Sequence, residues 1–434
     1  MQRERPVGLA PRSGRDGRRV RGRTPERTVT VKTSTDPEET RAVRARLADE
    51  LEAAGELTDP AWRTAVEKVP REAFVPGFYR SAGFVDGATR WEPVTAASDP
   101  AAWLDAVYSD TTLITQLDGK ATDWADPKPR VGGHFTSSST LPSLVVRMWE
   151  DADIHDGHSL LEVGTGTGYS TALACERLGS DLVTSVDVDG SVLDRAVDAL
   201  NRLGYMPWVA TADGLQGYWP GAPYDRIVAA CSVRCIPDTW LRQTTPGGRI
   251  LTTLGGWGDG YARVLLTVDG DRAHGHLLPG TVSFMPARRD ATPAPGNPYH
   301  WAMTAKEDED TTTRDTILSP VFYREATVSA FHARFVAQLA APTAQMVDPA
   351  GYPEGSVFLV DTASGSSAAI GPDGDGWTVT QSGPDRLWDR IEDAVMKWRA
   401  AGSFAMTEFE MTVHADEQLI RHAATGLRFV LPHL

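Results

Sequence analysis

The pattern of apolar and polar positions along the 434-residue chain predicts helices near its start. Apolar residues recur at helical spacing from Asp36 onward, and Gly55 ends this helix. A second short helix is expected after Asp59-Pro60, where the sequence again alternates apolar and polar residues at helical spacing. The N-terminal part of the folded protein is therefore expected to be helical.

Near the middle of the chain, a glycine-rich turn connects a strand to a helix. The apolar runs at 160–163 and 182–186 predict buried strands, and the residues after Tyr169 predict a helix between them. The turn consists of Gly164, Thr165, Gly166, Thr167 and Gly168. Glycine lets a ligand approach the backbone N–H groups at a helix N-terminus, where a Cβ would block it. The GxGxG spacing differs from the GxGxxG of nicotinamide-binding turns.

An acidic residue, Asp187, ends the second of these strands, nineteen residues after Gly168. An acid at that distance after a glycine turn suits the two hydroxyls of a ribose. The alternative is an ordinary strand–helix turn that binds no ligand. The offset of Asp187 favours the ligand site over that alternative.

The last 135 residues show a different pattern, with short strand-like pieces and one amphipathic helix. Residues 357–360 and 377–380 are strand-like, and 409–413 alternates as a half-buried strand does. A helix face is lined by Leu387, Ile391, Val395 and Trp398. This pattern predicts a small α+β unit in which Trp388 and Trp398 belong to the core rather than to a ligand platform.

Composition and charge narrow the possible functions. The formal net charge of −15 and a pI near 5.1 argue against a nucleic-acid-binding protein, whose binding surface would be basic. Three cysteines, without a second Cys/His pair at metal-ligand spacing, favour buried thiols in a reducing cytoplasm and no metal site. No apolar stretch approaches the ~20 residues that a membrane span needs.

The segment VPREAFVPGFYR, Val69 to Arg80, resembles the protein-L-isoaspartate O-methyltransferases, which carry a similar motif after two helices. The matching residues are Pro70, Arg71, Glu72, Phe74, Val75 and Pro76. The resemblance continues through the glycine turn to a final strand expected at 282–285, and it covers roughly residues 40–288. It implies an α/β fold of the class I S-adenosylmethionine-dependent methyltransferases, Rossmann-like with a doubly wound sheet.

The resemblance also implies a cofactor site for S-adenosyl-L-methionine. In the family an Asp-Gly pair touches the adenine, although Asp213 taken alone could equally be a turn residue before Gly214. The implied cofactor-binding residues are Glu162, Gly164, Thr165, Gly166, Thr167, Gly168, Tyr169, Asp187, Val188, Asp213 and Gly214.

A hydroxyl-rich segment lies where the family carries Gly-Gln-Thr-x-Ser-x-Pro, whose serine lies at the substrate carboxyl. Aligned on Pro142, Thr140 takes the position of that serine and Ser138 takes that of the threonine, while Thr136 and Ser137 replace Gly-Gln. The resemblance makes Ser138, Ser139 and Thr140 the candidate catalytic residues. The alternative is a polar loop that only caps the following helix.

A C-terminal extension together with a departure from Gly-Gln resembles a subset of the family associated with ribosomally synthesised, modified peptides, the lanthipeptides and graspetides. Its members methylate an aspartate, and the ester closes to an aspartimide. A modified precursor peptide is then the expected partner, with neither nucleic acid nor membrane. Repair of isoaspartate in damaged proteins is the alternative, and a peptide-binding escort without catalysis is a third class, which the intact glycine turn disfavours.

The domain organisation expected from the sequence has four parts. Residues 1–38 are expected to be a disordered basic arm, and 39–288 the methyltransferase domain. The Pro-rich segment 289–299 is expected to link this domain to an α+β substrate-recognition domain at 300–434. Two insertions relative to the family, at about 81–106 and 117–135, flank the hydroxyl-rich segment.

Overall fold

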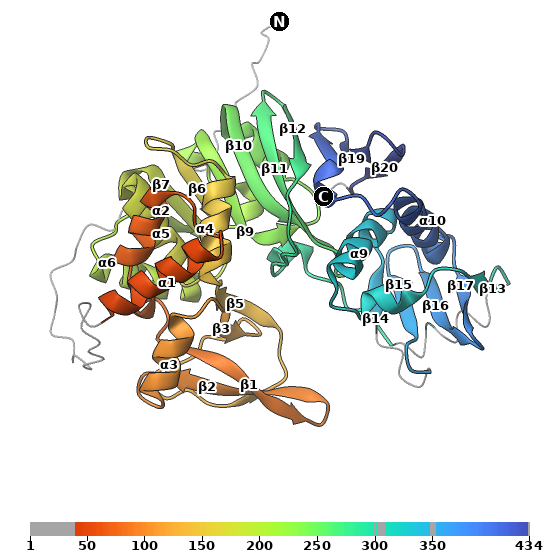
Figure 1. Ribbon diagram of the computed structural model, residues 1–434, viewed down its shortest axis with the longest axis horizontal. Helices are drawn as coiled ribbons and strands as arrows, with labels where there is room; N and C mark the ends of the chain where they lie inside the picture. Colours follow the sequence, from red (N-terminus) through yellow and green to blue (C-terminus); the bar gives the residue numbers. More distant parts are fainter. Residues whose placement is uncertain (1–39, 298–300, 302–308, 348–352, 433–434) are drawn as a thin grey trace, which may run out of the picture.

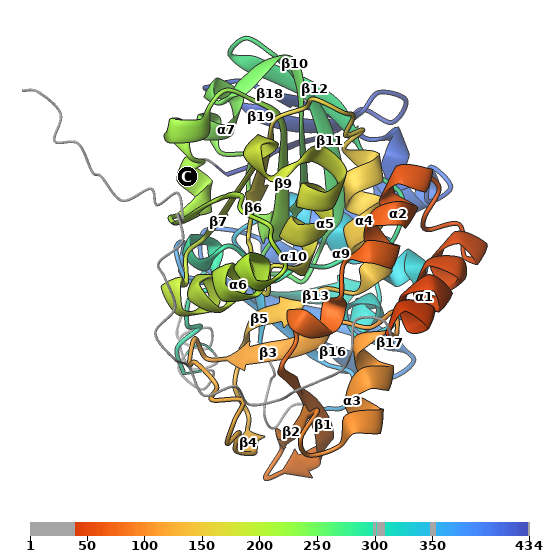
Figure 2. The same ribbon diagram turned by 90° about the vertical axis from the view of Figure 1, so that its left-hand side faces the viewer.

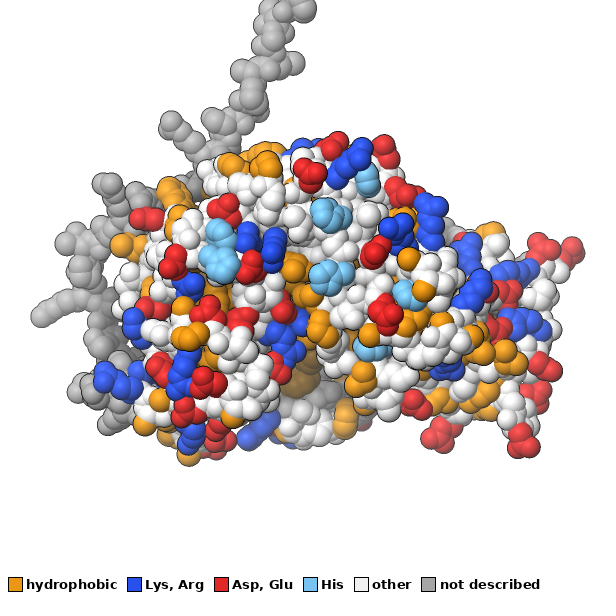
Figure 3. All heavy atoms as spheres, turned by 45° about the horizontal axis from the view of Figure 1, so that its top comes forward, with side chains coloured by type: hydrophobic (Ala, Val, Ile, Leu, Met, Phe, Trp, Pro, Cys, Tyr) orange, Lys and Arg blue, Asp and Glu red, His pale blue; other side chains and the backbone are white. Residues whose placement is uncertain are grey.

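The fold is described from a computed structural model, which covers residues 40–297, 301, 309–347 and 353–432. The basic arm expected at 1–38 therefore lies outside the described residues. None of the helices in the described ranges is both long and apolar enough to cross a membrane. On the face shown in Figure 3, acidic and basic side chains are intermixed.

A ten-stranded sheet forms the centre of the molecule (Figure 1). Its order is β20-β19-β18-β12-β11-β10-β9-β6-β7-β8. The bounds are β6 Leu160–Val163, β7 Val183–Asp187, β8 Trp208–Thr211, β9 Tyr224–Val233, β10 Thr244–Leu254, β11 Ala262–Asp269, β12 Arg272–Leu277, β18 Glu410–Val413, β19 Gln418–His422 and β20 Leu427–Val430. Strands β8, β7, β6, β9 and β10 are parallel, and the rest pair antiparallel. The expected doubly wound α/β fold is confirmed.

Helices cover the parallel part of this sheet (Figures 1 and 2). They are α1 Arg41–Ala53, α2 Pro60–Lys68, α4 Pro142–Asp151, α5 Tyr169–Leu178, α6 Gly190–Arg202 and α7 Asp238–Arg242. The two expected N-terminal helices are thus present, and the side chain of Asp59 caps α2 by accepting from Ala61 N. The rings of Trp62 and Trp149 stack at 6.1 Å between centroids and join α2 to α4. This layer fixes the helices that flank the glycine turn.

A second, smaller sheet projects from the N-terminal half (Figure 1). Its order is β4-β2-β1-β3-β5, with β1 Gly77–Val85, β2 Ala88–Thr95, β3 Leu113–Leu117, β4 Arg130–Val131 and β5 Phe135–Ser139, and α3 Pro100–Val107 lies beside it. The two expected insertions supply most of this sheet. The hydroxyl-rich segment is strand β5 and not a loop, because it pairs antiparallel with β3.

The C-terminal part contains a third sheet and two helices. The sheet order is β13-β17-β16-β15-β14, with β13 Thr312–Thr316, β14 Gln345–Val347, β15 Val357–Asp361, β16 Ser366–Asp373 and β17 Gly376–Ser382. Helices α9, Val328–Ala340, and α10, Leu387–Ala400, pack on it. Trp388 and Trp398 are 0% and 1% exposed, and their indole N–H groups donate to Thr316 and to Phe404. Both indoles are therefore core residues.

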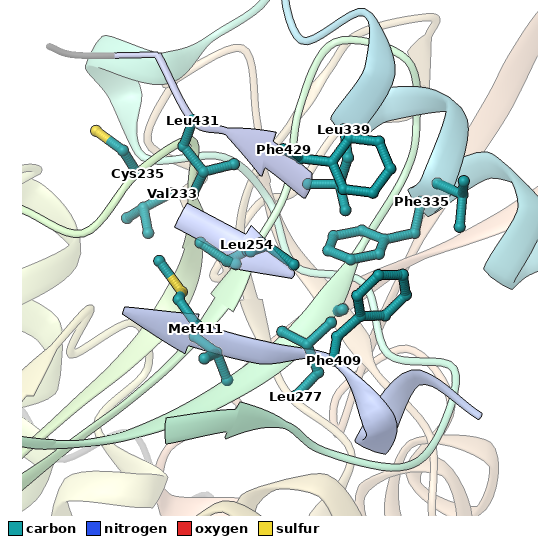
Figure 4. Close-up of a cluster of buried hydrophobic side chains, with 14 of the residues drawn as sticks. Val233, Cys235, Leu254, Leu277, Phe335, Leu339, Phe409, Met411, Phe429 and Leu431 are labelled. Atoms are coloured by element: carbon teal, nitrogen blue, oxygen red, sulfur yellow. The ribbon is translucent and has the colours of Figure 1, made fainter. Parts of the chain in front are cut away.

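The C-terminal part also completes the central sheet, which the sequence does not predict. Strand β18 pairs with β12, so the segment expected to be a separate domain from residue 300 supplies three strands of the methyltransferase sheet. Apolar side chains seal this junction (Figure 4), where Leu254 and Leu277 meet Phe335, Met411 and Phe429 in one buried cluster. Without β18, the edge of β12 would be left unpaired.

A strand expected at 282–285 is absent from the structure, and this prediction is wrong. The segment runs beside the end of β9 and makes a single bridge, Ser232 to Pro286. Ser232 N donates to Met285 O, and Ala287 N donates to Ser232 O. Since the chain then turns into a short 3-10 helix, Arg288–Asp290, the register with β9 goes no further.

Candidate functional site

A cavity of about 1290 Å³ lies at the carboxyl ends of the parallel strands. Strand β6 lies between β7 and β9, so the chain reverses its direction of growth across the sheet at this point. Ligands of α/β sheets bind at such a reversal. The walls come from the loops after β6, β7, β8, β9 and β10, from β5, and from the segment 283–292.

The glycine turn forms the floor of the cavity beside Asp187. Gly164 and Gly166 have φ of +99° and +54°, which side chains rarely adopt. Gly166 N donates to Asp187 Oδ2 at 2.9 Å, and Asp189 N donates to Asp187 Oδ1 at 2.9 Å. Burial raises the pKa of Asp187, while these two N–H bonds oppose the rise. The structure thus brings the predicted turn and the predicted acid together.

Glu162 lies beneath the turn and does not line the cavity. It is 1% exposed and accepts hydrogen bonds from the hydroxyls of Ser170, Thr171 and Ser185. Burial raises its pKa to about 6, although the three hydroxyls oppose this rise. This carboxylate therefore ties β6, α5 and β7 together, which is support for the turn and not a direct ligand contact.

Two further residues of the predicted cofactor set, Thr167 and Gly168, also lie outside the cavity lining. Gly168 has a φ of +92°, and a Cβ on it would meet Ala196 Cβ of α6 at 3.0 Å. The predicted residues that do line the cavity are Gly164, Thr165, Gly166, Tyr169, Asp187, Val188, Asp213 and Gly214.

Strand β5 passes directly above the glycine turn. The carbonyl oxygen of Ser138 would lie 3.4 Å from a Cβ placed on Gly166. Alternation along the strand leaves Ser138 and Thr140 half-buried, while Ser139 is 2% exposed. All three line the cavity, but Ser139 Oγ also accepts a hydrogen bond from Arg71 Nε at 3.3 Å. Ser138 and Thr140 are thus the better placed of the three candidates.

Arg71 anchors this strand from behind, a role that the sequence motif does not reveal. Its guanidinium is fully buried and donates to the carbonyl oxygens of Val107, Ser109, Thr111, Ser139 and Thr140. Burial lowers the pKa of Arg71 to about 10. One arginine therefore fixes the start of the loop before β3 and the end of β5.

The segment after Pro286 reaches across the cavity. Arg289 Nε lies 2.9 Å from Asp213 Oδ2, and Arg288 Nη2 donates to Thr136 O at 2.9 Å. The predicted adenine residue, Asp213, also accepts from Leu215 N at 3.1 Å. Arg288, the last residue of the expected methyltransferase domain, and Arg289, the first of the expected linker, thus contact the β5 side and the β8 side of the site, and no sequence signal singles them out.

Comparison with known proteins decides the family. The family model described as protein-L-isoaspartate(D-aspartate) O-methyltransferase (PCMT) matches residues 112–275. Protein-L-isoaspartate O-methyltransferase 1 of Archaeoglobus fulgidus is 30% identical over 251 residues, which are 57% of this chain and 93% of that protein. The Thermococcus onnurineus enzyme of the same name is 32% identical over 171 residues, or 38% of this chain and 74% of that protein. The chain belongs to the protein-L-isoaspartate O-methyltransferase family.

A solved structure named protein-L-isoaspartate O-methyltransferase aligns with 88% of this chain and 99% of its own, at 18% identity and a TM-score of 0.48. As a member of the family, the protein is a carboxyl O-methyltransferase whose cofactor is S-adenosyl-L-methionine. The site fits this cofactor, because no heavy atom lies closer than 3.4 Å to a Cβ placed on Gly164 or Gly166. The floor of the site therefore leaves room for a ligand against the backbone.

The rest of the cavity wall lies beyond the residues that the family motifs mark. It comes from the loops after β9 and β10 and includes Arg234 and Trp257, while Asp290 follows the end of the family match. Cys231 also lines the cavity, but burial raises the pKa of its thiol to about 12, so it remains protonated. In this methyltransferase the family motifs therefore mark the side of the cavity that holds the glycine turn, and they do not mark the opposite side.

Proposed function

We propose that this methyltransferase esterifies the side-chain carboxylate of an aspartate in a ribosomally synthesised, modified peptide, and that the ester closes to an aspartimide. The observation that supports it is strand β5, which carries Thr136 and Ser137 where the family has Gly-Gln and which passes directly above the glycine turn. Since these residues border the substrate end of the cavity, their replacement points to a substrate other than the family's usual one.

The methyl transfer depends more on the position of the carboxylate than on general acid–base catalysis. An aspartate side chain, with a free pKa of about 3.9, is already ionised at neutral pH and is its own nucleophile. S-Adenosylmethionine supplies an electrophilic methyl group when bound. The hydroxyls of Ser138 and Thr140 donate to one carboxylate oxygen and leave the other facing that methyl group. Neutral donors hold the substrate without the charge that would weaken its nucleophilicity.

The second step follows from the chemistry of the ester. The backbone nitrogen of the next residue attacks the ester carbonyl carbon, so that a C–N bond forms and the C–O bond to the methoxy group breaks. The proton of that N–H leaves with the methoxy group as methanol. The product is a five-membered aspartimide, which a carboxylate would form far more slowly because it is a poorer electrophile.

Isoaspartate repair is the second candidate, because the similar enzymes of Archaeoglobus fulgidus and Thermococcus onnurineus carry the name of that activity. General isoaspartate repair needs a binding site that accepts many different damaged protein sequences. The wall that β3, β5 and the segment 283–292 add to the cavity favours a defined peptide partner over a general one.

The decisive experiment compares two substrates under the same conditions. Enzyme and S-adenosylmethionine are incubated with the modified precursor peptide or with a synthetic isoaspartyl peptide, and the masses are followed. The proposal expects the precursor peptide to gain one methyl group and then to lose methanol. If the isoaspartyl peptide is by far the better substrate, repair becomes the function.

A pair of serine variants tests the role of β5. Ser138→Ala removes a cavity-lining hydroxyl. We expect a loss of about 1 kcal/mol in transition-state stabilisation, which lowers kcat/KM roughly fivefold. Ser367→Ala is the control, because Ser367 is also buried and its hydroxyl meets that of Ser382 at 3.0 Å, but it does not line the cavity. Equal losses for the two variants would remove Ser138 from the substrate site.

A further inference from the structure

Three side chains form a connected cluster in the cavity wall opposite the glycine turn: Arg234, Trp257 and Asp290, here called the Arg234 cluster. The guanidinium of Arg234 lies 3.6 Å from the centroid of the Trp257 ring. Arg234 N donates to Asp290 Oδ2, and Trp257 Nε1 donates to Asp290 O, each at 2.9 Å. All three residues line the cavity. Loops from three separate parts of the chain are thus locked into one wall.

Two buried atoms of this cluster, Arg234 Nε and Asp290 Oδ1, have no hydrogen-bond partner among the described residues. Asp290 is 2% exposed, and its Oδ1 accepts no hydrogen bond from any residue that the structure describes. Burying a carboxylate oxygen without a donor is costly, so such atoms are rare in folded proteins. Burial raises the pKa of this carboxyl group, and Arg234 opposes the rise through its backbone N–H and its charge. A donor supplied by a ligand would satisfy Oδ1.

The order of strands separates this cluster from the cofactor residues. Asp187 ends β7 and Asp213 follows β8, whereas Arg234 and Trp257 follow β9 and β10. Because the sheet order is β10-β9-β6-β7-β8, the two groups lie on opposite sides of β6 and its glycine turn. Arg234 and Trp257 therefore lie on the side of the cavity left for the substrate, whereas Asp290 is close enough to Asp213 for that carboxylate to raise its pKa.

Helix α9 of the C-terminal part holds this wall in place. Gln338 Oε1 accepts from Gly258 N at 2.5 Å, and Gln338 Nε2 donates to Pro342 O at 3.2 Å. Arg234 Nη2 donates to the same Pro342 oxygen at 3.0 Å. The contact is so close that a Cβ on Gly256 would lie 2.2 Å from Gln338 Cδ. On the inner face of α9, Phe335 and Leu339 enter the apolar cluster of Figure 4.

We propose that the Arg234 cluster binds the main chain of the peptide substrate beside the reacting aspartate, with Asp290 Oδ1 accepting a peptide N–H, and that Gln338 is the residue that positions it. The inference rests on the proposed function only in that the substrate is a peptide. Binding energy gained here, away from the reacting carboxylate, orients that carboxylate toward the methyl donor. Through Gln338 the C-terminal part of the chain influences peptide binding without itself having to contact the peptide.

Asp290→Asn tests the acceptor. Asparagine keeps the volume and an oxygen for Arg234 N, but it replaces the free acceptor with an NH₂ donor. We expect the dissociation constant of the peptide, measured by calorimetry without turnover, to rise tenfold or more, while that of S-adenosylhomocysteine stays within twofold of the parent. A comparable rise for S-adenosylhomocysteine would assign Asp290 to the cofactor site and overturn the inference, as would an unchanged peptide constant.

A matched pair of glutamine variants tests the positioning role. Gln418 makes the same kind of bridge as Gln338, since it accepts from Ile236 N at 2.8 Å and donates to Ile236 O at 2.7 Å, but Ile236 does not line the cavity. The two glutamines are 7% and 6% exposed. Replacing either with Met removes two buried hydrogen bonds and should lower Tm to a similar extent. Only Gln338→Met should raise the peptide constant by about fivefold or more.

The outcomes of this pair are distinct. Equal changes of the peptide constant in both variants, or no change in Gln338→Met, would reduce Gln338 to a structural residue and overturn its positioning role. If Gln338→Met does not fold, Gln338→Glu keeps the acceptor for Gly258 N and should bind the peptide almost as the parent does; a large loss there would contradict the proposal. Measuring both the precursor and the isoaspartyl peptide keeps the inference separate from the proposed function, because the cluster should serve whichever peptide binds.

Discussion

Two glycine-rich loops border the same cavity, and their glycines are required for different reasons. In the loop after β6, Gly164 and Gly166 have positive φ, and a Cβ on either would make no contact shorter than 3.4 Å. In the loop after β10, Gly256 and Gly260 need no unusual φ, but helix α9 fills the space that their Cβ atoms would occupy. The first loop uses glycine for backbone conformation and ligand access, and the second uses it for close packing.

The two loops also differ in the polar side chain that supports each one. Glu162 lies beneath the first loop and is an ionisable group held by three hydroxyls. Gln338 supports the second loop through one acceptor and one donor, and it carries no charge at any pH. A glycine-rich sequence alone therefore does not distinguish a ligand cradle from a packing contact.

The largest expected effect separates the two reasons for glycine. In Gly260→Ala the new Cβ would lie 2.6 Å from Arg334 O and 2.8 Å from Phe335 Cα, so backbone must move, and we expect a loss of about 3 kcal/mol in unfolding free energy. In Gly166→Ala the nearest atom is 3.4 Å away, and the left-handed backbone alone should cost about 1–2 kcal/mol. Urea unfolding of both variants measures the difference. A larger loss for Gly166→Ala would contradict the distinction.

Asp187, the acid beside the first loop, should affect the binding of the cofactor, whereas a change in the second loop should not. Asp187→Ala removes a carboxylate anchored by Gly166 N, and we expect the binding of S-adenosylmethionine to weaken by about 2 kcal/mol. Asp259→Gly is the control on the second loop, because Asp259 also lines the cavity and glycine suits its φ of +56°. Calorimetric titration of the cofactor should show no change in that control; an unchanged constant for Asp187→Ala would exclude Asp187 from the site.

The supports of the two loops should respond differently to pH. Burial raises the pKa of Glu162 to about 6 from its ordinary value of 4.5, so the folded state binds a proton that the unfolded state releases between these values. Its contribution to stability is therefore full below about pH 4.5 and is lost as pH rises through 6, by about 2 kcal/mol. The unfolding free energy of Glu162→Gln should therefore rise by about 2 kcal/mol relative to that of the parent as the pH increases from about 4.5 to above 6. A difference that is flat with pH would refute the raised pKa.

The smallest expected effect concerns the ion pair between Arg289 and Asp213. The arginine side chain is 66% exposed, so water screens the attraction despite the 2.9 Å separation. We expect Arg289→Ala to change the unfolding free energy by less than about 1 kcal/mol, with a smaller change at high salt. Thermal unfolding at two salt concentrations checks this. A loss of several kcal/mol would mean that the crossing segment stabilises the fold.

Local sequence patterns predict the region around the glycine turn well. The strand, the glycine turn and the helix from Leu160 onward, and the acid at Asp187, all lie where the spacing places them. These features depend on neighbours within about one turn or one strand, so the local spacing of residues is enough to predict them. The strand character of β5 is missed because a run of hydroxyls has little apolar alternation, and only pairing with β3 reveals it.

The opposite half of the site depends on partners that are distant in the sequence. Gly256, Gly258 and Gly260 of the second loop are explained by helix α9, whose Gln338 lies 80 residues beyond Gly258, and the edge of β12 is covered by β18. Arg289 begins the Pro-rich segment expected to be a linker, and Arg288 directly precedes it. Their roles depend on the path by which the chain returns to the cavity. The local spacing of apolar and polar residues does not indicate that path.

The late return of the chain to its central sheet also has a consequence for synthesis. Gln418 bonds Ile236 across 182 residues, and Val413 of β18 pairs with Ala273 of β12 across about 140, so the sheet is incomplete until residues 410–430 have left the ribosome. Until then a nascent chain exposes the edge of β12 and the apolar side chains behind it, a combination that favours aggregation. A chain whose synthesis stops before residue 410 should therefore need a chaperone to remain dispersed.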